Sequence, residues 1–60
     1  MAEEETVAVV DGPNGQAKII EIWANGRLVE YKVDFNGQTE TSVNIGDAYI
    51  VAGEKAGVKT

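Results

Sequence analysis

Residues 14–38 read NGQAKIIEIWANGRLVEYKVDFNGQ, and this stretch determines the fold that the sequence predicts. Asn-Gly occurs at residues 14–15, 25–26 and 36–37, at a regular interval of eleven residues. Asn and Gly tolerate the positive φ angles of tight hairpin turns, so each pair predicts a turn between two strands. The interval also fits a duplicated unit, an alternative that is disfavoured because the segments share little beyond their turns.

Short segments rich in β-branched and aromatic residues lie on both sides of these turns. None has an apolar period of 3.6 residues over a length sufficient for a helix. The five strands predicted in this way cover residues 6–10, 17–23, 28–33, 39–43 and 48–52. Turn signals at such spacings are typical of an all-β, mostly antiparallel meander that closes into a small barrel or rolled sheet.

The segment leading into the last predicted strand, IGDAYIV at residues 45–51, resembles the turn and strand of small SH3-like barrels. The resemblance concerns the fold and implies no function. The predicted organisation is a disordered acidic lead-in at residues 1–5, a single β domain at residues 6–53 and a flexible tail at residues 54–60.

The hairpin at residues 25–26 is predicted to have a two-residue turn. This register pairs Trp23 with Leu28 and Ile22 with Val29, and it places Glu21 opposite Glu30. Two like charges directly opposite each other destabilise a sheet, so this pair is either an exposed defect or a sign that the register is wrong.

The hairpin at residues 36–37 is predicted to have a three-residue loop that ends in a glycine bulge. A two-residue turn would place Glu40 opposite Val33, on the apolar face of the strand. The longer loop instead pairs Val33 with Thr39 and Lys32 with Glu40, which makes an ion pair. The longer loop is therefore preferred, since a slip of one residue turns a strand inside out.

These registers predict a core on one face of the sheet and a candidate binding patch on the other. The predicted core residues are Ile20, Ile22, Val29, Tyr31, Val33 and Val43, with Val7, Val9, Ile50 and one of Ala48 or Ala52. The candidate partner-binding residues are Trp23, Leu28 and Ile19, with Arg27 as a charged rim and Tyr49 as an extension. Aromatic anchors dominate binding surfaces, but in so small a barrel the same side chains could form a second small core.

The composition excludes several kinds of chemistry. The chain has 60 residues without cysteine or histidine, so catalysis or metal binding by those residues is impossible. The carboxylates of Glu21 and Glu30 lack the cleft that a catalytic pair needs. The turn at residues 11–15 does not match a calcium loop, and no glycine-rich phosphate loop precedes a helix. We therefore expect no enzymatic activity, no cofactor and no metal.

The charge is unevenly distributed. The net charge is −5, and Glu3, Glu4 and Glu5 account for three of the ten acidic residues. The rest of the chain is nearly balanced and has no basic stripe, which disfavours nucleic acid as a partner. The two lysines of the tail are expected to be solvated, with contact to an anionic partner as the alternative.

The sequence thus predicts a soluble cytoplasmic domain without a secretory signal or membrane span, which binds a protein partner through the face that carries Trp23. An added strand along residues 7–10 or 48–52 would fit this function. The first alternative is an acidic inhibitor that presents carboxylates to a basic site on a nucleic-acid enzyme. The second alternative is a structural subunit that self-associates, because a core of this size is marginal.

Overall fold

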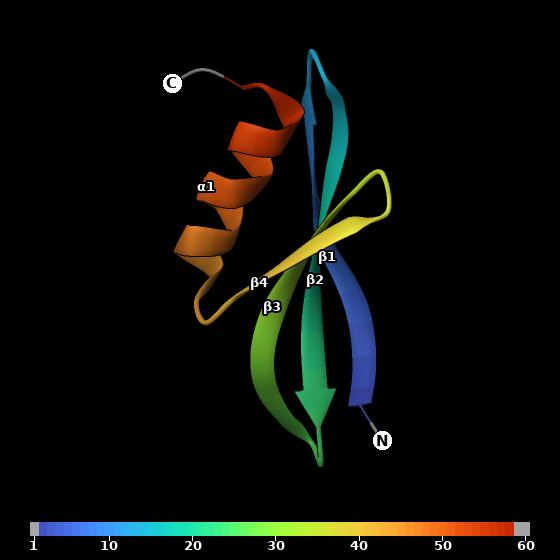
Figure 1. Ribbon diagram of the computed structural model, residues 1–60. Helices are drawn as coiled ribbons and strands as arrows, with labels where there is room; N and C mark the ends of the chain where they lie inside the picture. The colour runs from blue at the N-terminus through green and yellow to red at the C-terminus, as the bar shows by residue number, and fades with distance from the viewer. Residues whose placement is uncertain (1, 59–60) are drawn as a thin grey trace.

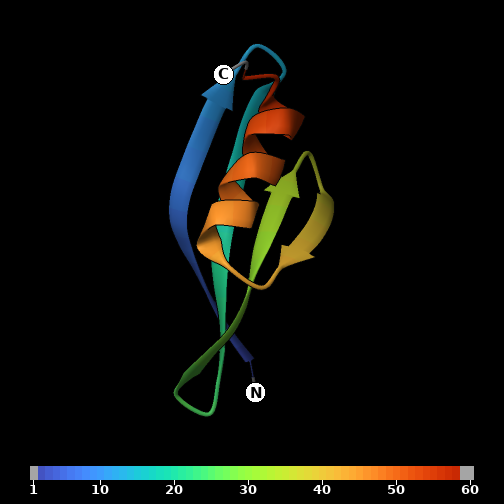
Figure 2. The ribbon, with the colours of Figure 1, turned by 90° about the vertical axis from the view of Figure 1, so that its left-hand side faces the viewer.

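The computed structural model describes residues 2–58 and contains one four-stranded antiparallel sheet and one helix. The elements in chain order are β1 (Ala2–Gly12), β2 (Gly15–Ala24), β3 (Arg27–Phe35), β4 (Gln38–Ser42) and α1 (Ile45–Ala56). The strands pair in the order β1-β2-β3-β4, so the sheet is open, and α1 packs on one face of its upper half (Figures 1 and 2). The β-rich meander is confirmed, whereas the closed barrel and the fifth strand are not observed.

The predicted fifth strand, residues 48–52, lies in α1 because local signals at the start of the helix outweigh the β-branched residues inside it. Asn44 is the N-cap, and its side-chain oxygen accepts a hydrogen bond from the Asp47 backbone N–H at 2.8 Å. The three buried residues of the helix are spaced four apart, at Ala48, Ala52 and Ala56. This spacing puts them on one face of a helix, whereas a strand would bury every second residue.

The helix ends at Ala56 in a glycine motif. Gly57 has a φ of 83°, and its N–H donates to the carbonyl oxygen of Glu54 at 3.3 Å, while the Val58 N–H donates to that of Gly53 at 2.9 Å. These two bonds satisfy carbonyl groups that the helix leaves without partners. The predicted flexible tail is therefore helical up to Ala56, and residues 59–60 of that tail lie outside the described residues.

Two of the three predicted Asn-Gly turns are confirmed. Asn25 and Asn36 have φ values of 55° and 52°, and each is followed by a glycine with positive φ, as the tight turns of hairpins require. The first turn instead contains Pro13 and Asn14, because Gly12 pairs with Gly15. Proline cannot adopt a positive φ, so this turn belongs to a different type.

The register between β2 and β3 is confirmed next to the turn and wrong beyond it. Trp23 pairs with Leu28 as predicted, but a bulge follows, so Ile22 lies opposite Glu30 and Glu21 opposite Tyr31. Val29 is the extra residue of β3 in this bulge. The bulge separates the two glutamates that the simple register placed opposite each other, which removes the like-charge pair.

The predicted three-residue loop between β3 and β4 is wrong. Phe35 pairs with Gln38, so the turn has two residues, and Val33 lies opposite Glu40. The carboxylate of Glu40 reaches Lys55 Nζ on α1 at 2.9 Å. A glutamate on the core side of this edge strand thus has a partner from the helix, which the all-β prediction did not contain.

The core lies between α1 and the sheet face that carries Ile19 and Val33. Its buried residues are Ala17, Ile19, Val33, Ala48, Ala52 and Ala56, with Ala8, Val10, Tyr31, Phe35 and Val51 packed around them. The predicted core face is confirmed for Tyr31 and Val33 of β3 but inverted for β2, because the bulge at Val29 places Ile19 opposite Val33, where the predicted register would have placed Lys18. The predicted core residues Val7, Val9, Val29, Val43 and Ile50 are exposed.

The acidic residues of the predicted lead-in belong to β1. Glu3, Glu4 and Glu5 pair with Trp23, Ile22 and Glu21 of β2, and a bulge follows between Thr6 and Ala8. The prediction of a disordered segment at residues 1–5 is therefore corrected to a strand that begins at Ala2, and Met1 lies outside the described residues.

Candidate functional site

Three of the predicted site residues lie together at the free end of the β2–β3 hairpin, which extends beyond α1 (Figures 1 and 2). Trp23 is half-buried, Leu28 directly opposite it is 39% exposed, and Arg27 beside Leu28 is exposed. We call Trp23, Arg27, Leu28 and Val29 the hairpin tip. The indole N–H of Trp23 donates to Glu21 Oε1 at 3.0 Å, which orients the ring along the strand.

The other two predicted site residues lie elsewhere. Ile19 is completely buried in the core beneath α1, so it is not available to a partner. Tyr49 is on α1, where it lines a separate groove with residues that were not among the predicted site residues. The five predicted residues therefore divide among the hairpin tip, the core and the helix.

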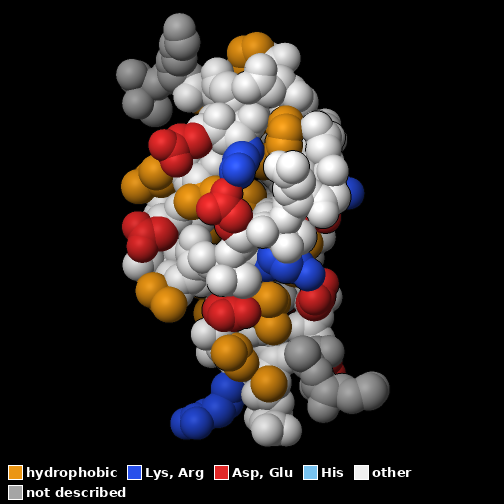
Figure 3. All heavy atoms as spheres, in the orientation of Figure 1, with side chains coloured by type: hydrophobic (Ala, Val, Ile, Leu, Met, Phe, Trp, Pro, Cys, Tyr) orange, Lys and Arg blue, Asp and Glu red, His pale blue; other side chains and the backbone are white. Residues whose placement is uncertain are grey.

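The groove containing Tyr49 lies between α1 and β1. It has a volume of about 450 Å³ and is lined by Val10, Tyr49, Ile50, Gly53, Glu54 and Val58. Ile50 and Tyr49 are 63% and 49% exposed, respectively. Figure 3 shows one group of hydrophobic side chains over α1 and another over the lower end of the sheet. We call the groove bounded by those six lining residues the β1–α1 groove.

The β1–α1 groove lies next to an open sheet edge. Among the described residues no strand pairs with the outer side of β1, which is the first strand in the sheet order (Figure 2). Gly12 and Gly15 flank a two-residue turn and therefore form a hydrogen-bonded pair, and such pairs alternate along the strand. This alternation directs the backbone N–H and C=O groups of Val9 and Asp11 away from β2, toward the open edge.

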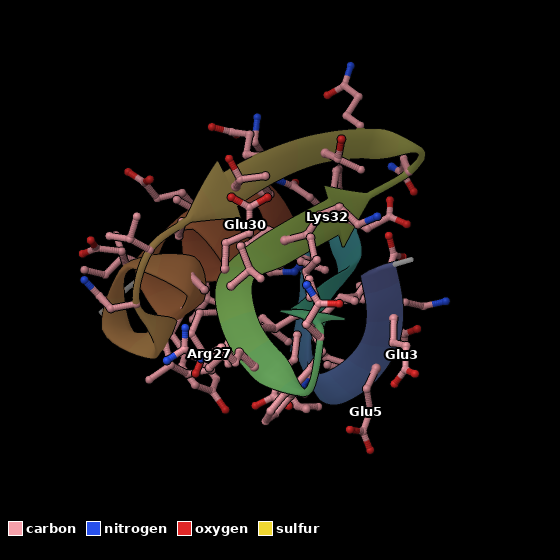
Figure 4. All side chains as sticks on the ribbon, turned by 90° about the horizontal axis from the view of Figure 1, so that it is seen from below. Glu3, Glu5, Arg27, Glu30 and Lys32 are labelled. Carbon is pink, nitrogen blue, oxygen red and sulfur yellow. The ribbon has the colours of Figure 1, made fainter. Side chains whose placement is uncertain are left out.

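Acidic side chains surround this edge. β1 contains Glu3, Glu4, Glu5 and Asp11 and has no lysine or arginine, and Glu54 lines the groove. Figure 4 shows Glu3 and Glu5 projecting outward from β1. Asp11 and Glu54 therefore make the edge beside the groove negative, whereas Glu3, Glu4 and Glu5 lie toward the other end of β1.

Glu4 differs from the other carboxylates of β1 because it forms an ion pair within the sheet. Its Oε2 lies 2.8 Å from Lys32 Nζ on β3, so the pair crosses β2 on the face opposite α1. Ile20 is on that face and is 8% exposed. The ion pair helps to cover Ile20, since the aliphatic stem of a lysine can lie on apolar surface.

A second, polar pocket lies on the sheet near the β3–β4 turn. It has a volume of about 380 Å³ and is lined by Gln16, Lys18, Asp34, Asn36 and Gly37. Asp34 Oδ1 accepts a hydrogen bond from the Gly37 N–H at 3.2 Å, so this carboxylate stabilises the turn. Within residues 2–58, no group of three or more acidic side chains is arranged to hold a metal ion.

The residues of the groove were not predicted from the sequence, because the segment that forms the helix was predicted as a strand. The signal was present in the capping pair Asn44 and Asp47 and in alanines at intervals of four. A helix that turns these alanines toward the sheet buries Ala52 and leaves Ile50 on its outer side.

Comparison with protein-family models, with curated proteins and with solved structures finds no match. Within the described part of the chain, no helix is long and apolar enough to cross a membrane. The geometry of the β1–α1 groove and the hairpin tip is therefore the basis for assigning a function.

Proposed function

We propose that this chain is a non-enzymatic protein-interaction domain whose binding site is the β1–α1 groove. The observation that carries the proposal is the position of this apolar groove beside the unpaired edge of β1. A partner segment that lies there gains two kinds of contact. It pairs its backbone with a strand edge and buries side chains against the wall of a helix.

The apolar surface in the groove supports this function. Ile50 projects from α1 on the side away from the buried alanines, Tyr49 lies at the margin of their face, and neither side chain belongs to the buried core. Burying apolar surface contributes roughly 25 cal/mol per Å². The groove thus offers a partner favourable burial without any rearrangement of the core.

A selection experiment tests the function and does not require an identified partner. Random peptides displayed on phage are selected on the immobilised full chain, and the affinities of enriched peptides are measured for wild type and for two variants. Ile50→Ser alters the groove, and Leu28→Ser alters the hairpin tip. Both residues are exposed, so both substitutions leave the buried core intact.

The expected result is enrichment of peptides whose affinity falls with Ile50→Ser and is unchanged with Leu28→Ser. Enriched peptides that respond only to Leu28→Ser would move the binding site to the hairpin tip. Failure to enrich any peptide that distinguishes the wild type from the groove variant would overturn the proposal for this site.

A second candidate function is the acidic inhibitor, which is favoured because the acidic residues lie in a regular strand, β1. Glu3 and Glu5 lie on a paired strand, where their spacing is fixed. Replacing both by Gln is expected to weaken an electrostatic complex, and raising the salt concentration should have the same effect. The test is binding to an immobilised polycation such as polylysine, with Glu30→Gln on β3 as the control.

A further inference from the structure

We infer that the β1–α1 groove takes an extended, basic peptide segment that adds to β1 as a fifth strand. This inference rests on the proposed function and specifies the chemistry of its partner. Alternate side chains of the segment are aliphatic and lie in the groove, while the side chains between them are Lys or Arg and face the acidic edge.

The backbone of β1 supports the addition of a strand. The N–H and C=O groups of Val9 and Asp11 point outward under the register of the β1–β2 pair. Within the described chain, β1 has no lysine or proline, the residues that natural edge strands use against unwanted pairing. This edge can therefore accept backbone hydrogen bonds from an incoming strand.

The groove determines the side-chain pattern of that segment. Side chains of a strand alternate between its two faces, so every second residue of an added strand lies on the α1 side. There it meets Val10, Ile50 and Val58, which are aliphatic. The remaining residues lie on the opposite face, beside Val9 and Asp11.

The charge of the edge determines the sign of the partner. Asp11 lies on the face where the Lys or Arg side chains project, Glu54 lines the groove on the other side, and neither forms an ion pair with another described residue. Unpaired carboxylates on both sides of one edge attract a cationic strand and repel an acidic one. A basic segment therefore fits this edge better than a neutral or acidic segment.

The same charges argue against a second copy of this chain as the occupant. Pairing β1 with its own copy brings together two strands that both contain acidic residues and no basic ones. Each chain has a net charge of −5, which adds further repulsion. Self-association through this edge is therefore an alternative outcome of the experiment, not the expected one.

The experiment uses a fluorescent peptide in which Lys and Val alternate, titrated with the full chain and followed by fluorescence anisotropy. Two matched peptides carry N-methyl groups, one on every lysine amide and one on every valine amide. In a paired strand one set of amides faces β1 and the other faces solvent. The two methylated peptides have the same charge and composition, so a difference in affinity reports strand pairing.

The expected result is that one methylated peptide binds at least about tenfold more weakly than the other, because it cannot form the backbone hydrogen bonds to β1. Asp11→Asn and Ile50→Ser should each weaken the unmethylated peptide several-fold. Glu30→Gln, which removes an acid from β3, should leave its affinity unchanged. A peptide in which Glu replaces Lys is expected not to bind.

Equal affinities of the two methylated peptides would overturn strand addition and leave surface electrostatics as the cause of binding. Absence of binding by the Lys-Val peptide would also overturn it. So would a concentration-dependent dimer, detected by sedimentation, that is lost with Asp11→Lys. The proposed function still holds if phage-selected peptides that are not basic lose affinity with Ile50→Ser. Failure of strand addition is therefore distinguishable from failure of the proposed function.

Discussion

The backbone N–H of Asn14 donates to the carbonyl oxygen of Ala56 at 2.8 Å, which joins the first turn to the last residue of α1. The side-chain amide of Asn14 also donates to the Lys55 carbonyl oxygen at 3.4 Å. These bonds satisfy helix carbonyls that have no partner within the helix. They tie the C-terminal end of α1 to the β1–β2 turn and thereby fix one end of the groove.

Gly12 makes this approach possible. A Cβ atom at position 12 would lie 2.3 Å from the Ala56 carbonyl oxygen, closer than atoms can pack. Gly12→Ala is expected to lower the free energy of unfolding by about 1–3 kcal/mol or more, because the backbone must move to relieve the overlap. Urea unfolding followed by far-UV circular dichroism measures the change.

Gly53→Ala is the matched control for this prediction. A Cβ at position 53 meets no atom within 4 Å. Since alanine favours a helix over glycine, this variant is expected to gain roughly 0.5–1 kcal/mol of stability. Equal stabilities for the two variants would contradict the close packing of Gly12 on α1.

The N-cap predicts a second result. Asn44→Ala removes the oxygen that accepts a hydrogen bond from the Asp47 N–H, and it should cost about 1 kcal/mol of stability. Asn44→Ser retains an acceptor at the cap and is expected to recover most of that loss. Thermal unfolding of the three proteins provides the comparison, and a fully stable Asn44→Ala protein would show that the cap is dispensable.

The alanine face of α1 predicts a third result. Ala52 is completely buried, so α1 lies close to the sheet and leaves no space for a larger side chain. Ala52→Leu is expected to destabilise the fold by about 1–3 kcal/mol through overpacking. Glu54→Leu on the exposed side of the same helix is the control, and its free energy of unfolding from chemical denaturation should be close to that of wild type.

Trp23 predicts a spectroscopic result. The ring is half-buried at the hairpin tip and its N–H is hydrogen-bonded to Glu21. Its fluorescence maximum should lie between those of buried and fully solvated indole, and acrylamide should quench it. A strongly blue-shifted emission that acrylamide does not quench would contradict the exposure of the hairpin tip.

Local turn chemistry made most of the sheet predictable. The Asn-Gly pairs at residues 25–26 and 36–37 lie in the turns that their positive φ values favour. The strand pairing next to the second turn followed directly, as Trp23 opposite Leu28 shows. These features depend on residues close in sequence, and therefore the sequence was sufficient to predict them.

The remaining features depend on contacts that are distant in sequence. Glu40 looks misplaced opposite Val33 until Lys55 of the helix is present beside it. The like-charge conflict between Glu21 and Glu30 indicated an error, but not that a bulge at Val29 resolves it. The groove was beyond reach for the same reason, because one of its walls is the helix that was predicted as a strand.

The dependence of the groove on α1 has a dynamic consequence. The sheet is built from hairpins between neighbouring strands, whereas α1 is held by contacts distant in sequence, namely its buried alanines on the sheet, Lys55 with Glu40, and Asn14 with Ala56. A transient opening that releases the helix abolishes the groove but can leave the hairpins paired. A bound segment must therefore suppress that opening, and its signature is slower amide hydrogen exchange throughout α1, including residues that the segment never touches.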